Sequence, residues 1–132
     1  MQYAFNKYAP TSLIYPTEPK ARAKVDSLLY FDQGTFYKTV SKYIYNSIGI
    51  RYGPRNDPDE KRAFWEQVDF IENHLINDKF LTGDTMTIAD VSLAMSMSMP
   101  MVYLGSDCYR KFPKITGWFS KLQPISPTWA MA

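Results

Sequence analysis

The stretch of residues 87–104 constrains the fold most, because it is apolar or small on nearly every side. Its apolar and small members include Ile88, Ala89, Val91, Leu93, Ala94, Met95, Met97 and Met99. A helix without a polar face is normally surrounded by other helices. The stretch contains three serines and Pro100, and it is shorter than the roughly 20 apolar residues that span a membrane. It therefore predicts the central helix of a bundle, ended by Gly105, and no membrane partner.

The longest helical pattern in the chain covers residues 20–48. Pro19 suits the first turn of a helix, and Gly49 is placed to end it. Two neighbouring stripes follow its length: Ala21, Val25, Leu28, Asp32 and Thr35 form one, and Leu29, Phe36, Val40 and Tyr43 form the other. Gly34 within the pattern costs about 1 kcal/mol relative to Ala, so we expect another helix to cross closely there.

Shorter helices are predicted around these two. One begins at Asp57, with Pro58 in its first position, and Glu60 is expected to reach back to the backbone N–H of the cap. Another covers residues 112–122, and residues 3–8 form one or two helical turns. Strand-like alternation is hard to find. The chain is therefore predicted to be one all-α domain, a bundle of about five helices around a buried central helix.

Composition excludes several classes of protein. The 132 residues are 45% hydrophobic, and 15 basic and 13 acidic side chains give a net charge of +2. Such apolar content excludes a disordered tail, and so small a charge gives no field that attracts nucleic acid or acidic lipid. The N-terminal residues lack the basic start and apolar run of a signal peptide, and the single cysteine, Cys108, fits a reducing compartment. We therefore expect a cytoplasmic protein without a nucleic-acid partner.

The sequence contains no self-contained active site. A nucleophile needs a base within reach, and the chain offers one His, His74, and one Cys, Cys108, without a recognisable spacing around either. One His and one Cys cannot bind zinc without several carboxylates, and no glycine-rich phosphate loop is present. Several carboxylates are expected on polar faces or at helix starts: Glu18, Glu60, Glu66, Asp69 and Glu72. We therefore predict no catalytic residue, no metal and no cofactor held by this chain alone.

The strongest local signal is a capping box at the start of the central helix. Thr87 can accept a backbone N–H three residues on, and Asp90 can accept the N–H of Thr87 in return. Met86 and Val91 occupy the positions of a hydrophobic staple. Replacing Thr87 or Asp90 is expected to cost about 1–2 kcal/mol. These residues are predicted to stabilise the fold and not to catalyse a reaction.

The same segment also carries a resemblance to a known family. The pattern Gly83-Asp84-x-x-Thr87-Ile88-Ala89-Asp90 before a buried helix resembles the capping-box motif in the C-terminal, all-helical domain of cytosolic glutathione transferases. Further stretches resemble the insect delta and epsilon classes of that family: residues 6–10, 13–16, 20–26, 29–35 and 112–118. The resemblance covers essentially the whole chain.

The resemblance implies a domain division and a large missing part. In this family a thioredoxin-like domain binds glutathione, carries the hydroxyl that activates its thiol, and precedes the helical domain. Residues 1–16 would then be the end of its last helix and the interdomain linker, and residues 17–132 the helical domain. The groups that bind and activate glutathione would all precede residue 1, so the chain is expected to be truncated and inactive. Glutathione becomes a co-substrate only when the missing domain is supplied.

The resemblance also suggests where substrates bind. In this family the first long helix lines the pocket for the apolar electrophile, and the matching residues are Tyr37, Val40, Ser41, Ile44, Tyr45 and Ile48. A stripe of aromatic and aliphatic side chains is equally expected of a core or a dimer contact. Asp32 would reach the glutathione of the opposite subunit in a homodimer, whereas a purely local contact is the plainer alternative.

Two functions from different classes follow. The first is the electrophile-binding half of a glutathione transferase, which in a complete protein conjugates glutathione to apolar electrophiles in detoxification. The second is a stand-alone, non-enzymatic helical module for protein assembly or apolar ligand binding, a reuse of such domains found in translation factors and synthetase complexes. The second requires that the face normally covered by the thioredoxin-like domain be polar or covered by a partner. Tyr3, Phe5 and Tyr8 argue against a polar face.

Overall fold

The computed structural model describes residues 2–49, 57–76 and 79–125. Its α-helices are α1 (Gln2–Tyr8), α2 (Pro19–Phe31), α3 (Tyr37–Ser47), α4 (Pro58–Phe70), α5 (Ile88–Leu104) and α6 (Pro113–Leu122). π-Helical turns follow α2 and α4, at η1 (Asp32–Phe36) and η2 (Ile71–Leu75), and the 3₁₀ turn η3 (Gln123–Ile125) follows α6. These ranges contain no β-strand, only an isolated bridge between Phe80 and Gly83. The all-α prediction is confirmed.

The predicted long helix is present as α2, η1 and α3 in unbroken succession. The side chain of Glu18 caps its start by accepting the backbone N–H groups of Lys20 and Ala21, at 3.0 and 2.6 Å. Its end lies where predicted, because α3 stops at Ser47 and Gly49 adopts a φ of 77°. Glycine favours this left-handed region because it has no Cβ. If α2, η1 and α3 are counted as one long helix, the described residues form about five helices, as predicted.

The predicted close crossing at Gly34 is wrong. A Cβ built on Gly34 would meet no heavy atom within 4 Å. Gly34 instead lies on the exposed side of the π-helical turn η1. A π-helical turn contains an extra residue per turn, and here the widened turn directs its two buried side chains, Asp32 and Phe36, toward the bundle. The cost of the glycine is therefore not offset by a close helix contact.

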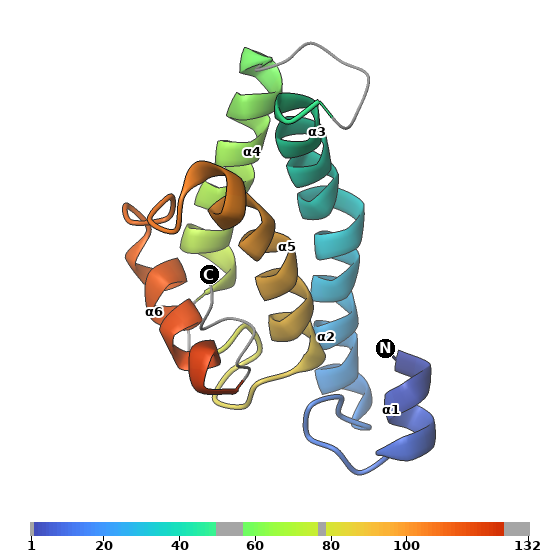
Figure 1. Ribbon diagram of the computed structural model, residues 1–132. Helices are drawn as coiled ribbons and strands as arrows, with labels where there is room; N and C mark the ends of the chain where they lie inside the picture. Colours follow the sequence, from blue (N-terminus) through green and yellow to red (C-terminus); the bar gives the residue numbers. More distant parts are fainter. Residues whose placement is uncertain (1, 50–56, 77–78, 126–132) are drawn as a thin grey trace.

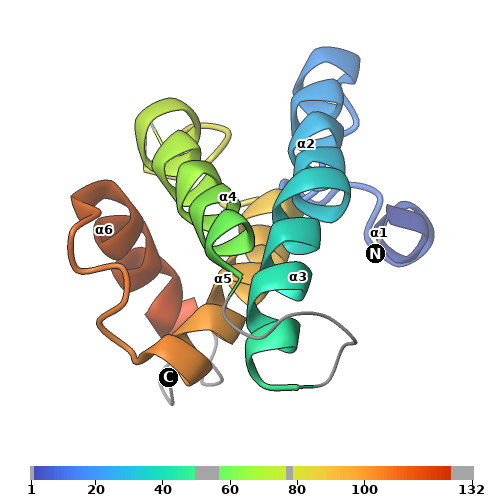
Figure 2. The same cartoon turned by 90° about the horizontal axis from the view of Figure 1, so that it is seen from above.

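Helix α5 occupies the centre of the bundle and packs against α2 and α3, while α4 packs against α3 and lies between α3 and α6 (Figures 1 and 2). Its inward residues are almost inaccessible: Ile88, Ala89, Leu93, Ala94 and Met97 are at most 2% exposed. The predicted central helix is thus confirmed, but it is not covered on all sides. Met95, Val102, Tyr103 and Leu104 are between 38% and 68% exposed, so α5 keeps an uncovered side and an uncovered C-terminal end.

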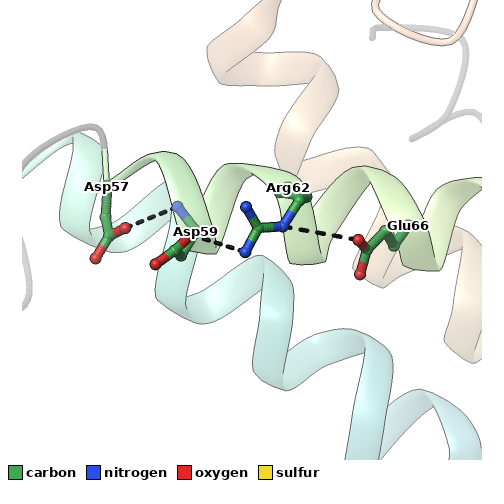
Figure 3. Close-up of polar contacts among 4 residues, drawn as sticks. All are labelled: Asp57, Asp59, Arg62 and Glu66. Carbon is green, nitrogen blue, oxygen red and sulfur yellow. Dashed lines mark hydrogen bonds and ion pairs between the residues drawn. The ribbon is translucent and has the colours of Figure 1, made fainter.

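The start of α4 agrees with the prediction in its cap, Asp57, and in its first residue, Pro58, but not in the contact made by Glu60. Asp57 Oδ1 accepts the N–H of Asp59 at 2.8 Å, and Arg62 then pairs with Asp59 and Glu66 along the exposed side of the helix (Figure 3). Glu60 does not reach back to the cap. Its carboxylate accepts from Asn46 Nδ2 at 2.8 and 2.9 Å, which joins α4 to α3. The predicted contact from Glu60 is therefore wrong, because a tertiary partner takes its carboxylate.

Thr87 and Asp90 form a capping box at the start of α5. Asp90 Oδ2 accepts the backbone N–H of Thr87 at 2.8 Å and its hydroxyl at 3.1 Å. Asp90 Oδ1 accepts two further bonds, from the N–H of Leu81 at 2.9 Å and from Trp118 Nε1 at 3.0 Å. Since Asp90 is 0% exposed, this carboxylate joins the loop before α5, the start of α5 and α6 inside the core.

A second buried carboxylate caps α6. Glu72 in η2 is 8% exposed, and its two oxygens accept the backbone N–H groups of Lys114 and Ile115 at 3.0 and 2.9 Å. These N–H groups belong to the first turn of α6, where no carbonyl of the helix is available to them. The expectation that Glu72 lies on a polar face is therefore wrong, because it bonds the end of a neighbouring helix.

Within the described ranges, no helix is both long enough and apolar enough to cross a membrane. The proposed boundary at residue 16 lies in the segment between α1 and α2. This segment contacts the bundle, since the carbonyl of Ile14 accepts the N–H of Ile88 at 2.9 Å. The division into residues 1–16 and 17–132 stays a prediction.

Candidate functional site

The six residues predicted to contact an electrophile divide into two groups. Val40 and Ile44 face the interior, where they are 0% and 1% exposed. The other four are partly exposed along α3 and just after its last residue: Tyr37, Ser41, Tyr45 and Ile48. Their spacing of three and four residues places these four on one side of the helix. The structure therefore brings a face with two tyrosines to the surface, and Val40 and Ile44 lie beneath it in the interior.

Two tyrosine hydroxyls meet on this face. Tyr37 Oη and Tyr45 Oη, two helical turns apart, are separated by 3.1 Å. The pKa of Tyr45 is raised, first by its hydrogen bond with Tyr37, then by burial and by the nearby phenols of Tyr37 and Tyr103. Tyr103 comes from the C-terminal turn of α5 and is 44% exposed. We call Tyr37, Tyr45 and Tyr103 the tyrosine face.

Tyr103 was not identified from the sequence. It lies 58 residues beyond Tyr45, and periodicity within one helix cannot show which residue of another helix packs beside it. The only available signal was its position near the end of the central helix, where a large polar aromatic residue interrupts the apolar pattern.

The tyrosine face lies outside both of the cavities that the structure shows most clearly. A cavity of about 640 Å³ lies between the start of α2 and the loop at residues 82–87. Another of about 500 Å³ lies between α4 and the segment formed by η1 and α3. None of the six residues predicted to contact an electrophile lines either cavity. A small molecule on the tyrosine face would therefore need a second wall to be enclosed, since binding sites bury most of their ligand.

Asp32 lies inside the bundle, where it is 0% exposed. Its Oδ2 accepts the hydroxyl of Ser92 on α5 and, at 3.3 Å, Nε2 of Gln33. Its Oδ1 has no hydrogen-bond partner in the part of the chain that the structure describes. The carboxylate thus joins η1 to α5 inside the bundle. Its contact with the glutathione of a second subunit stays a prediction.

The single His and the single Cys lie in different parts of the fold. His74 lies in η2, with its ring 5.0 Å from that of Phe70. Cys108 is half-buried, and burial followed by the charge of Asp107 raises the pKa of its thiol to about 11. Such a thiol is almost wholly protonated at neutral pH, and the thiolate is the reactive form. Among the described residues, no group of three His, Cys, Asp or Glu side chains is placed to hold a metal ion.

The comparisons of this chain with a family model and with solved structures agree on one protein family. Residues 36–123 match the family described as "Glutathione S-transferase, C-terminal domain". Among solved structures, glutathione transferase E6 from Drosophila melanogaster is 30% identical with a TM-score of 0.79, and an epsilon-class glutathione S-transferase from the housefly Musca domestica is 30% identical with a TM-score of 0.77. A delta-class glutathione transferase from Nilaparvata lugens is 28% identical with a TM-score of 0.84.

The chain is matched almost completely, whereas the similar structures are matched only in part. The match covers 92% of the chain and 55% of the Drosophila protein, and 92% of the chain and 56% of the housefly protein. For the Nilaparvata protein it covers 96% of the chain and 57% of the relative. The chain therefore spans less than two thirds of the length of each of these relatives.

Proposed function

Because the chain belongs to the glutathione S-transferase family through its C-terminal domain, we propose that it is the half of such an enzyme that binds the apolar electrophile. The tyrosine face supplies one wall of the electrophile site, and Ile48 and Ser41 extend it along α3. A thioredoxin-like domain supplies the opposite wall, binds glutathione and activates its thiol. The 132-residue chain alone does not conjugate glutathione. In the complete form the reaction serves detoxification in the cytoplasm.

The observation that carries this proposal is the open tyrosine face beside an uncovered side of α5. Tyr37 and Tyr45 are already fixed by their hydroxyl contact of 3.1 Å. Met95 and Val102, seven residues apart on one side of α5, are 51% and 68% exposed, and Leu104 at its C-terminal end is 38% exposed. Apolar side chains that lie together at a surface mark a site of association or ligand binding. Covering this side of the bundle would enclose the tyrosine face, which is what an electrophile site requires.

A homodimer is part of the same proposal. The 500 Å³ cavity between α3 and α4 is lined by basic residues from one side and acidic residues from the other: Lys38, Lys42, Asp59 and Glu60. A two-fold dimer places the same patch of both subunits together, so basic residues of one copy can face acidic residues of the other. This arrangement leaves the tyrosine face available to the thioredoxin-like domain.

We expect that joining a thioredoxin-like domain to the 132-residue chain creates activity. The chain alone, given glutathione and an apolar aromatic electrophile, should react no faster than a heat-denatured sample, because no group in it activates the thiol. The chain joined to the thioredoxin-like domain of the delta-class Nilaparvata relative should conjugate the two at a rate above that of either half. Product formation followed by absorbance measures both rates.

The control is retention of the joined protein on immobilised glutathione, which shows that the added domain is folded. A joined protein that binds glutathione yet conjugates no apolar electrophile contradicts the proposal, and so does clear activity of the 132-residue chain alone. The first result would favour the alternative of a stand-alone assembly or ligand-binding module, whereas the second would show that the chain itself carries the groups that activate glutathione. Self-association that increases with protein concentration, measured by sedimentation, would instead support the proposed function. It would indicate an exposed apolar face that another domain covers in the complete protein.

A further inference from the structure

Helix α1 is a short helix that stands beside α2 and outside the bundle (Figures 1 and 2). It has seven residues and none of them is buried. A helix of this length does not persist alone in water, because too few hydrogen bonds follow the costly first turn. Phe5 is its one partly buried residue that packs against the core. Contacts other than a buried apolar face must therefore hold α1 in place.

Two charged residues of α2 provide these contacts. Asp26 Oδ1 accepts Nε2 of Gln2 at 2.7 Å, and Arg22 Nη2 donates to Oδ1 of Asn6 at 3.0 Å. Gln2 and Asn6 lie four residues apart on α1, as Arg22 and Asp26 do on α2, so the two pairs meet along one line between the helices. Each end of α1 is thus bonded to a charged side chain of α2.

The same two residues also hold the segment that connects the helices. Asp26 Oδ1 accepts the hydroxyl of Tyr15 at 2.8 Å, and Arg22 Nε donates to the carbonyl of Pro16 at 2.8 Å. The guanidinium of Arg22 also lies 4.4 Å from the centre of the Tyr15 ring. Tyr15 is 4% exposed, and its pKa is raised by burial and by the bond to Asp26.

Arg22 and Asp26 have no ion pair with each other among the described residues. Opposite charges four residues apart on a helix commonly pair, yet here both charged groups are directed to α1 and the connecting segment. Bonds to a charged group are stronger than those between neutral groups. The arrangement therefore adds directional bonds to the one apolar contact that Phe5 makes with the core.

We propose that Arg22 and Asp26 are positioning residues that hold α1, and any domain that continues from α1, at a fixed angle to the helical bundle. We call these two residues and their partners Gln2, Asn6, Tyr15 and Pro16 the α1 latch. The latch is a property of the 132-residue chain. Its effect on catalysis rests on the proposed function: the latch sets how closely the glutathione-binding half approaches the tyrosine face.

Amide hydrogen exchange followed by mass spectrometry tests the latch in the chain itself. In the Arg22→Ala and Asp26→Ala variants, the amides of residues 6–9 should exchange at least about tenfold faster than in the unchanged chain, because α1 leaves α2 and unfolds. The amides of α5 should keep their protection. Gln2→Ala should give part of the effect, since Asp26 keeps its bond to Tyr15. Ser27→Ala is the matched control, because Ser27 is exposed on α2 and bonds only the carbonyl of Lys24.

Equal exchange of residues 6–9 in the variants and in the unchanged chain would overturn the latch. Loss of protection in α5 together with α1 would also overturn it, because the two residues would then support the whole fold. In the joined protein, the double variant should lower kcat while the KM for glutathione changes less than about twofold. An inactive joined protein contradicts the proposed function, whereas the exchange result decides the latch independently.

Discussion

Replacing Asp90 with Ala should lower the free energy of unfolding by about 4 kcal/mol, more than any other single change of a polar residue considered for this chain. Asp90 is 0% exposed and accepts bonds from Leu81, Thr87 and Trp118. Its removal leaves buried donors without an acceptor, and each such donor costs about 1–3 kcal/mol. The loss exceeds the 1–2 kcal/mol expected of a helix cap alone, because the indole of Trp118 and the amide of Leu81 depend on the same carboxylate. Urea unfolding followed by tryptophan fluorescence measures the change.

Asp84→Ala is the matched control for Asp90→Ala. Asp84 lies in the same loop but is exposed, so its replacement should change the free energy of unfolding by less than about 0.5 kcal/mol. Asp90→Asn keeps the size of the side chain and one acceptor oxygen, and it should lie between Asp90→Ala and the unchanged chain. This variant gives a measurable value if Asp90→Ala is too unstable to fold. A loss below about 2 kcal/mol for Asp90→Ala would contradict the role of Asp90 as a shared acceptor.

Replacing Glu72 with Ala should lower the free energy of unfolding by about 2–3 kcal/mol. The two oxygens of Glu72 accept the N–H groups of Lys114 and Ile115, and the residue is 8% exposed. Bonds to a charged acceptor contribute more than neutral ones, about 1.5–3 kcal/mol. A carboxylate at a helix start also interacts favourably with the helix dipole. The same urea experiment measures the loss, and exchange of the first amides of α6 should accelerate with it.

The control for Glu72→Ala is Glu66→Ala. Glu66 lies on the exposed side of α4, where its carboxylate is 3.8 Å from Arg62 and its side chain is 65% exposed (Figure 3). Exposed ion pairs contribute about 0–1 kcal/mol, so Glu66→Ala should be nearly neutral. Equal losses for Glu66→Ala and Glu72→Ala would show that both act through general helix stability and not through a cap on α6.

The fold follows from the sequence wherever local rules decide it. Pro19 and Gly49 mark helix ends by their own backbone preferences, and Asp57 marks one by its side-chain cap. The absence of a polar side predicts the central position of α5. The predicted contacts of Glu60 and Glu72 were wrong because contacts between distant parts of the chain decide them. Each binds a partner more than ten residues away, at Asn46 and at the start of α6, and helical periodicity carries no information about such partners.

The candidate site was predictable only in part. The spacing on α3 identified a common side for Tyr37, Ser41 and Tyr45, but it could not separate them from Val40 and Ile44, which lie within the same wide stripe. Which edge of the stripe is buried depends on the positions of α4 and α5. Tyr103 could not be found for the same reason. The π-helical turn η1 also shifts the register between α2 and α3, so stripes drawn with one helical period across both are misaligned.

The measurement that tests the central claim most directly is the Michaelis constant for each substrate in the joined protein carrying Tyr45→Ala. If the tyrosine face is a wall of the electrophile site, the KM for an apolar electrophile should rise about tenfold, because about 1.5 kcal/mol of apolar contact is lost. The KM for glutathione should change less than about twofold. Tyr30→Ala, which removes a tyrosine that is 73% exposed on α2, should change neither constant. An unchanged KM for the electrophile, or an equal rise in both constants, would contradict the claim that this chain supplies the electrophile site.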